Sequence, residues 1–178
     1  KVHKGVRRLM IRSTDNPTAG VFAILRAAGE STRMGCSKPL LPWASTTLVV
    51  HQVRELLRAG VEGVVVVIGH EPELVAEQLK GLDGVTSVVN HRYKLGMSTS
   101  IVAGEAAVPD SARALIILAV DHPRTAELVG LLIRAHFSGQ QLITVPASGG
   151  RRGARGRWSC GCAWPPGPYR TGPDRLDD

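Results

Sequence analysis

The sequence predicts an α/β fold of three layers, in which a mostly parallel, Rossmann-like sheet has helices on both faces. Two observations predict it. Short, continuous apolar runs rich in Val and Ile recur along the chain, as in strands buried on both faces. Segments with apolar residues at helical spacing lie between these runs. The strand–helix alternation repeats four times, which implies crossover connections between parallel strands.

Five apolar runs are the predicted strands. Each is four to seven residues long, within the normal range for a strand. They are Val21–Leu25, Gly63–Gly69, Thr86–Asn90, Ala114–Val120 and Leu142–Val145.

Four segments between and after these runs are the predicted helices. In the first, Leu48, Val49, Val53 and Leu56 follow helical spacing, and Gly60 stands where a helix ends. The four span residues 48–57, 71–79, 97–108 and 125–137. Ligands of such sheets bind beyond the carboxyl ends of the strands, so the residues that follow each strand are the candidate site.

The length of 178 residues is that of one domain, and its net charge of +7 is confined to the ends. Residues 1–12 hold five Lys or Arg and no acid, and residues 151–178 hold six Arg and three Asp. Residues 13–150, with 11 basic and 12 acidic side chains, are almost neutral. A nucleic-acid partner is therefore not expected, since a basic footprint would lie on the folded body.

Neither a membrane nor an oxidising compartment is expected. No apolar run approaches the roughly 20 residues that span a bilayer. The three cysteines have irregular spacing and form no disulfide framework, so the cytoplasm is the predicted location.

The segment from Ala27 to Lys38 is the candidate phosphate-binding loop. Its small residues and two glycines allow close backbone approach to a ligand, and consecutive amide groups form an anion-binding nest. Arg33 and Lys38 add two positive charges that suit a triphosphate. The loop fits neither G-x-x-x-x-G-K-[ST] nor G-x-G-x-x-G, and an ordinary strand–helix turn is the alternative.

Asp121 is the candidate metal ligand. It directly follows an apolar run, so its carboxylate is expected at the ligand-binding edge of the sheet. A lone carboxylate there is costly unless it meets a cation, and Mg²⁺ binds one or two carboxylates together with phosphate oxygens and water. The alternative is that Asp121 caps the helix that begins near Thr125, although three residues intervene. His122 and His70 follow strands as well, without a pattern that assigns them a role.

Four ordered motifs resemble the molybdenum-cofactor nucleotidyltransferases, within the wider nucleotide-diphosphosugar transferase fold. The resemblance is greatest to the cytidylyltransferase branch. The motifs are L-x-A-A-G-x-S-x-R-M-G-x-x-K-x-L-L at residues 25–41, N-x5-GM-x2-S-x3-G at 90–104, L-x-x-D-x-P at 118–123 and Gly149–Gly153. They cover about three-quarters of the chain, from residue 21 to residue 153.

The resemblance implies the roles of individual residues. The nucleotide and its phosphates would be held by Ala27, Ala28, Gly29, Arg33 and Lys38. Asp121 would coordinate Mg²⁺, and Asn90, Met97 and Ser100 would line the site. In the family, paired alanines in the loop accompany cytidine, so the resemblance favours CTP over GTP.

The sequence departs from the family at both a strand end and the tail. Arg26 stands where the family has an apolar residue, usually Leu. After Gly153 the expected His-Pro and closing strand are replaced by a Gly/Pro/Arg-rich stretch. We predict a basic extension over residues 1–19, a nucleotidyltransferase domain over 20–153, and a tail over 154–178 that is disordered or read from a shifted frame.

The function predicted from these patterns is the transfer of CMP from CTP to the phosphate of molybdopterin, with release of pyrophosphate. The partners implied by the resemblance are CTP, the pterin cofactor and a molybdoenzyme that receives it. Two alternatives remain open. One is another cytidylyl- or sugar-phosphate nucleotidylyltransferase of the same fold, and the other is a non-catalytic relative that binds the cofactor.

Overall fold

A parallel sheet of four strands forms the centre of the computed structural model, which describes residues 18–30, 36–139, 141–148 and 151–152. The strands are β1 (Val21–Ala27), β4 (Gly63–Ile68), β5 (Val85–Val89) and β6 (Ala114–Ala119), in the order β5-β4-β1-β6. β1 is parallel to both β4 and β6, with Phe22 opposite Gly63 and Leu115. The chain therefore changes direction across the sheet at β1, where ligands of open α/β sheets bind.

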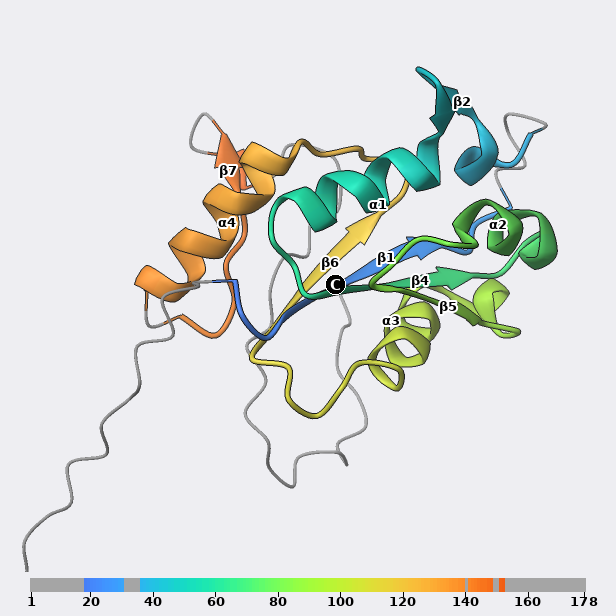
Figure 1. The fold of residues 1–178 in the computed structure, drawn as a ribbon. Helices are drawn as coiled ribbons and strands as arrows, with labels where there is room; N and C mark the ends of the chain where they lie inside the picture. Colours follow the sequence, from blue (N-terminus) through green and yellow to red (C-terminus); the bar gives the residue numbers. More distant parts are fainter. Residues whose placement is uncertain (1–17, 31–35, 140, 149–150, 153–178) are drawn as a thin grey trace, which may run out of the picture.

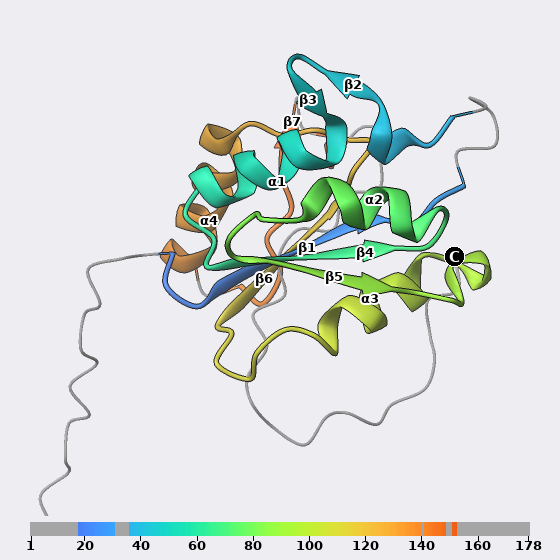
Figure 2. The same cartoon turned by 45° about the vertical axis from the view of Figure 1, so that its right-hand side comes forward.

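The helices cover the two faces unequally (Figures 1 and 2). α1 (Leu48–Arg58), α2 (Pro72–Leu79) and α4 (Ala126–Ser138) lie on one face, and α3 (Met97–Glu105) lies on the other. Two single turns of 3-10 helix, η1 (Lys38–Leu40) and η2 (Tyr93–Leu95), precede α1 and α3. The remaining strands are short: β2 (Pro42–Trp43) pairs with β3 (Thr46–Thr47), and β7 (Ala147–Ser148) with β8 (Arg151–Arg152).

Alternation along the strands divides the core into two clusters. Val21, Ala23, Leu25 and Ala27 of β1 point to the face of α1, α2 and α4, where they join Leu56 and other helix residues. The intervening Phe22 and Ile24 point to the face of α3. The next residue in this second series is Arg26, so its side chain begins on the α3 side of the sheet.

The structure confirms the predicted three-layer fold, four of the five predicted strands and all four helices, to within three residues at each end. Gly60, with a φ of 90°, ends the first helix as expected. Thr125 caps α4, since its side chain accepts a hydrogen bond from Leu128 N at 3.5 Å.

Two expectations about strands are wrong. The strand predicted at Leu142–Val145 is reduced to an isolated β-bridge at Ile143, and Leu142 and Ile143 are 68% and 59% exposed. Pro146, which lacks an N–H group, follows this run of only four residues. β5 forms, but it is not buried on both faces, because it is an edge strand with Thr86 and Ser87 exposed.

In the described ranges, no helix has the length and apolar character needed to cross a membrane. The predicted N-terminal extension lies almost entirely outside the described residues, and the predicted tail lies wholly outside them.

Candidate active site

A cavity of about 300 Å³ lies at the carboxyl edge of the sheet, and it is the size of small-molecule sites. Three loops or turns surround it: the residues that end and follow β1, those that follow β6, and the segment from η2 into α3. Its lining residues are Arg26, Ala28, Gly29, Lys38, Tyr93, Gly96, Met97, Ser100, Ala119 and Asp121.

Lys38 and Asp121 form an ion pair in the lining of this cavity. Lys38 Nζ donates to Asp121 Oδ2 at 3.2 Å, although the side chains remain 32% and 40% exposed. Asp121 reaches this edge because Val120 N still bonds to Arg26 O at 3.0 Å, so the strand pairing continues up to the carboxylate. Thr125 caps α4, which excludes the alternative that Asp121 does so. His122 Nε2 is 4.0 Å from Asp121 Oδ1.

The loop that carries Asp121 is fixed from α1 by two buried polar residues. Gln52 is fully buried, and its Nε2 donates to Arg124 O at 3.1 Å while its Oε1 accepts from Arg124 N at 2.7 Å. Glu55 accepts from Ala126 N at 2.8 Å, at the first turn of α4. These bonds position the loop between β6 and α4 without contacting the cavity.

Asn90 fixes the position of α3 in a similar way. It is buried, and its Nδ2 donates to Ser100 Oγ at 3.0 Å and to Thr99 Oγ1 at 2.9 Å. Its Oδ1 accepts from Arg92 N at 2.9 Å. Asn90 therefore ties the end of β5 to the first turns of α3, and Ser100 rather than Asn90 lines the cavity.

Glu30 connects the start of the Gly-rich loop to η2. Its Oε1 accepts from Lys94 Nζ at 2.8 Å and from Tyr93 OH at 2.9 Å. The hydrogen bond from Lys94, and after it the one from Tyr93, lower the pKa of Glu30 below that of an ordinary glutamate. The same contact raises the pKa of Tyr93 and that of Lys94. Gly69 also permits the close approach of these segments, since a Cβ there would lie 2.6 Å from Ala28 O.

The structure brings together six of the residues predicted from the sequence: Ala28, Gly29, Lys38, Met97, Ser100 and Asp121. Ala27 has its side chain in the core, so a role in nucleotide binding would fall to its backbone. Arg33 lies outside the described residues.

Sequence reasoning missed several residues that shape the site. Gln52 and Glu55 were recognisable in principle, because they are polar residues on the apolar face of a predicted helix. The contacts of Glu30 with Tyr93 gave no local signal, since 63 positions separate the two residues.

The donor set suits a metal only together with a ligand. In the described part of the chain, no three His, Cys, Asp or Glu side chains gather as a metal site would require. Among the described residues that line the cavity, Asp121 is the only one with a carboxylate. One carboxylate completed by phosphate oxygens and water is a normal environment for Mg²⁺, so the residues fit a nucleotide-bound ion.

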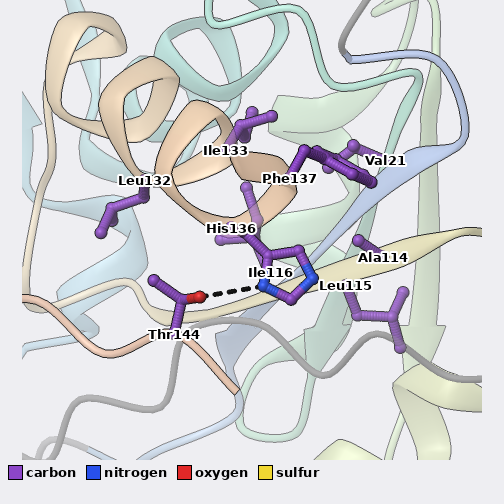
Figure 3. Close-up of a pocket in the computed structure, with 9 residues that line it drawn as sticks. All are labelled: Val21, Ala114, Leu115, Ile116, Leu132, Ile133, His136, Phe137 and Thr144. Carbon is purple, nitrogen blue, oxygen red and sulfur yellow. Dashed lines mark hydrogen bonds between the residues drawn. The ribbon is translucent and has the colours of Figure 1, made fainter. Parts of the chain in front are cut away.

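A second cavity has a different character (Figure 3). It has a volume of about 20 Å³ and lies against the amino-terminal halves of β1 and β6, beneath α4. Its lining is apolar except for His136, whose Nδ1 is 2.9 Å from Thr144 Oγ1, and Thr144 itself. Its size and its distance from the carboxyl edge make it a packing defect of the core rather than a substrate site.

The fold and the carboxyl-edge cavity define an α/β protein with a small-molecule site at the edge where such sheets bind ligands. Residues 23–165 match the MobA-like NTP transferase domain, so the chain belongs to this family. The family supports the prediction of a nucleotidyltransferase, and it agrees with the resemblance found in the sequence at the level of the family.

Curated relatives of this chain carry different activities in their names. Nicotine blue oxidoreductase of Paenarthrobacter nicotinovorans is 36% identical over 129 residues, which are 71% of this chain and 61% of that protein. The bifunctional IPC transferase and DIPP synthase of Rubrobacter xylanophilus is 40% identical over 121 residues, 65% of this chain and 27% of that protein. The chain thus spans less than two-thirds of the length of these relatives.

Solved structures show the same fold. A nucleotidyl transferase from Methanothermobacter thermautotrophicus has a TM-score of 0.58 and 26% identity, over 64% of this chain and 56% of that one. A Mycobacterium tuberculosis protein solved as a complex with manganese has a TM-score of 0.53 and 22% identity, over 66% of this chain and 60% of that one. At this identity the second likeness concerns the fold alone.

Proposed function

We propose that this chain is a nucleotidyltransferase that moves CMP from CTP to the phosphate of molybdopterin. The observation that carries the proposal is the Lys38–Asp121 pair in a cavity at the carboxyl edge of the sheet, beside a Gly-rich loop. Family membership supports the reaction type, and the motif resemblance supports the base and the acceptor. A molybdoenzyme that receives the product is the proposed partner.

In this reaction an oxygen of the acceptor phosphate attacks the α-phosphorus of CTP. A new O–P bond forms as the bond from the α-phosphorus to its bridging oxygen breaks, and pyrophosphate leaves. The acceptor phosphate, with a second pKa of about 6, is mostly dianionic at neutral pH and needs no general base. This suits a cavity whose described lining residues include no histidine.

The chain contributes alignment and charge. Lys38, together with Arg33 from the sequence motif, would neutralise the triphosphate, and the backbone of Ala28 and Gly29 would approach it closely. Asp121 would hold Mg²⁺, which supplies further neutralisation of the phosphates when bound. The manganese complex of the mycobacterial structural neighbour supports a divalent ion on this fold.

Nucleotide selection tests the proposal. Thermal-shift titration with each of the four NTPs and Mg²⁺ should give the largest stabilisation with CTP. A larger stabilisation by GTP at equal concentration would reject the cytidylyl assignment and leave the fold unaffected. Pyrophosphate release from CTP that depends on the pterin acceptor separates this enzyme from a sugar-phosphate nucleotidylyltransferase and from a non-catalytic carrier.

The relative named as an oxidoreductase favours a second candidate function. Its 36% identity extends over most of this chain, so redox chemistry on the same domain is the specific rival. Conversion of nicotine blue in the presence of a chemical reductant, measured beside pyrophosphate release from CTP, distinguishes the two. Turnover of nicotine blue without any release of pyrophosphate would favour the oxidoreductase.

A further inference from the structure

Arg26 is a charged residue at the end of an otherwise apolar strand, and it lacks a partner for a buried atom. It is the only polar or charged residue of β1. Its Nε is buried and has no hydrogen-bond partner in the part of the chain that the structure describes. A buried N–H group without an acceptor is unfavourable. A ligand that supplies an acceptor here would therefore gain binding free energy.

The side chain enters the cavity from the side of α3. Arg26 continues the series of Phe22 and Ile24, which face α3. Gly104 of α3 packs against Ile24, and Ser100 lies one turn nearer the carboxyl edge, where it lines the cavity beside Arg26. Lys38 enters from the opposite side, because η1 packs against α1 and α2.

The cavity therefore has two different halves. One holds Lys38, Asp121 and the start of the Gly-rich loop, which suit phosphates and an ion. The other holds Arg26 together with Tyr93, Gly96, Met97 and Ser100, which offer flat, small and polar surfaces. A nucleotide with its triphosphate in the first half would extend its nucleoside into the second.

We propose that Arg26 selects CTP over UTP by donating two hydrogen bonds to the O2 and N3 acceptors of cytosine. The inference rests on the proposed function, and it assigns to this chain a residue that the family motif does not provide. A guanidinium offers parallel N–H donors in a fixed plane. Uracil carries a hydrogen on N3, which would face another donor, so Arg26 favours CTP over UTP.

The electrostatics of Arg26 agree with a hydrogen-bonding role. Burial lowers the pKa of its guanidinium, and the nearby charge of Asp121 acts in the opposite direction. The group stays protonated at neutral pH, as arginine does throughout proteins. Arg26 thus remains a donor, and the acceptors of a nucleobase would compensate the desolvation of its buried Nε.

Calorimetry with CTP, UTP and inorganic tripolyphosphate, each with Mg²⁺, tests the proposal. Arg26→Leu should weaken CTP binding by about 10-fold or more, abolish the preference for CTP over UTP, and leave tripolyphosphate binding unchanged. Arg26→Lys keeps the charge but not the paired donors, and it should fail to restore the preference. Arg134→Leu, an exposed arginine of α4, removes the same charge away from the cavity and should change nothing.

The outcomes separate this inference from the proposed function. If the wild type binds CTP and Arg26→Leu keeps the same ratio of CTP to UTP affinity, the inference is wrong and the proposed function stands. If Arg26→Leu loses tripolyphosphate as strongly as CTP, Arg26 binds phosphate and the base assignment is wrong. If the wild type binds no nucleotide, both fail. Far-UV circular dichroism confirms that each variant is folded.

Discussion

Lys38 Nζ and Asp121 Oδ2 lie 3.2 Å apart, although 83 positions separate the two residues in the sequence. Both side chains are partly exposed, so their ion pair contributes little to stability, about 0–1 kcal/mol. Each is also the group that a ligand would need: the ammonium for phosphate and the carboxylate for a metal. Binding of a metal–nucleotide complex would exchange this contact for two stronger ones, and the pair keeps both groups in place beforehand.

Replacement of Lys38 by Ala should weaken CTP binding by about 1.5–3 kcal/mol, the range for hydrogen bonds to charged groups. The physical reason is the loss of a cation that faces the phosphate half of the cavity. Calorimetry measures the effect. The matched control is Lys80→Ala, which removes a surface lysine paired with Glu77 and should leave the affinity unchanged. Equal CTP affinity in the Lys38 variant and the wild type would contradict the assignment.

Replacement of Asp121 by Asn should preserve the fold and remove the dependence of CTP binding on Mg²⁺. The amide keeps the shape of the carboxylate and loses the charge that attracts the ion. Mg²⁺ dehydrates reluctantly and gains most by bridging protein to phosphate, so binding of the ion alone should be weak even in the wild type. Titration of CTP at several Mg²⁺ concentrations measures this.

Asp110→Asn is the control for this change, since Asp110 is exposed in the loop before β6, at the opposite edge of the sheet. It should retain the full dependence on Mg²⁺. If Asp121→Asn retains it too, the ion is held elsewhere and Asp121 is only a loop residue.

The strands that are buried on both faces could be predicted from the sequence, whereas the exposure of the others could not. β4 and β6 are buried almost throughout, so continuous apolar runs identified them. β5 has the same kind of run but lies at an edge, and its exposure depends on the order of strands, which local sequence does not encode. The run at Leu142–Val145 is equally apolar, yet it remains exposed because a short run carries no information about a neighbouring strand.

The site was predictable where a residue follows a strand directly. Asp121 and the Gly-rich loop were found in this way, because carboxyl ends of parallel strands share one edge. The support of the site was not predictable, since it comes from contacts between distant segments. Gln52 bonds to Arg124 across 72 positions, and Tyr93 bonds to Glu30 across 63.

Glu30 should titrate below the pH expected for an ordinary glutamate, because Lys94 and then Tyr93 donate hydrogen bonds to its charged form. The pKa is lower in the folded state than in the unfolded state. The contact therefore stabilises the fold above the unfolded-state pKa, and this stabilisation is lost as the pH falls through the folded-state pKa. NMR titration of the Glu30 carboxyl carbon measures the shift.

Lys94→Gln should raise the pKa of Glu30 toward its ordinary value, since it removes the largest cause of the shift. Lys80→Gln, directly after α2 and outside this cluster, should leave that pKa unchanged. An unaltered titration of Glu30 in the Lys94 variant would show that the ion pair does not persist in solution.

Gly104 lies in the last turn of α3 and Gly130 in the interior of α4, and their replacement by Ala should have opposite effects on stability. A Cβ at Gly104 would lie 2.6 Å from Ile24 Cγ2 and 2.9 Å from Val67 Cγ2, so either α3 or these β-branched side chains must shift. Such overpacking should lower the free energy of unfolding by about 1–3 kcal/mol. At Gly130 the atom nearest to an added Cβ is the flexible end of Arg134, at 3.3 Å. Alanine there should raise the free energy of unfolding by about 0.5–1 kcal/mol, because alanine favours the helix more than glycine does. Urea denaturation of the two variants measures both changes. A stabilised Gly104→Ala variant would mean that α3 does not pack this closely on β1 and β4.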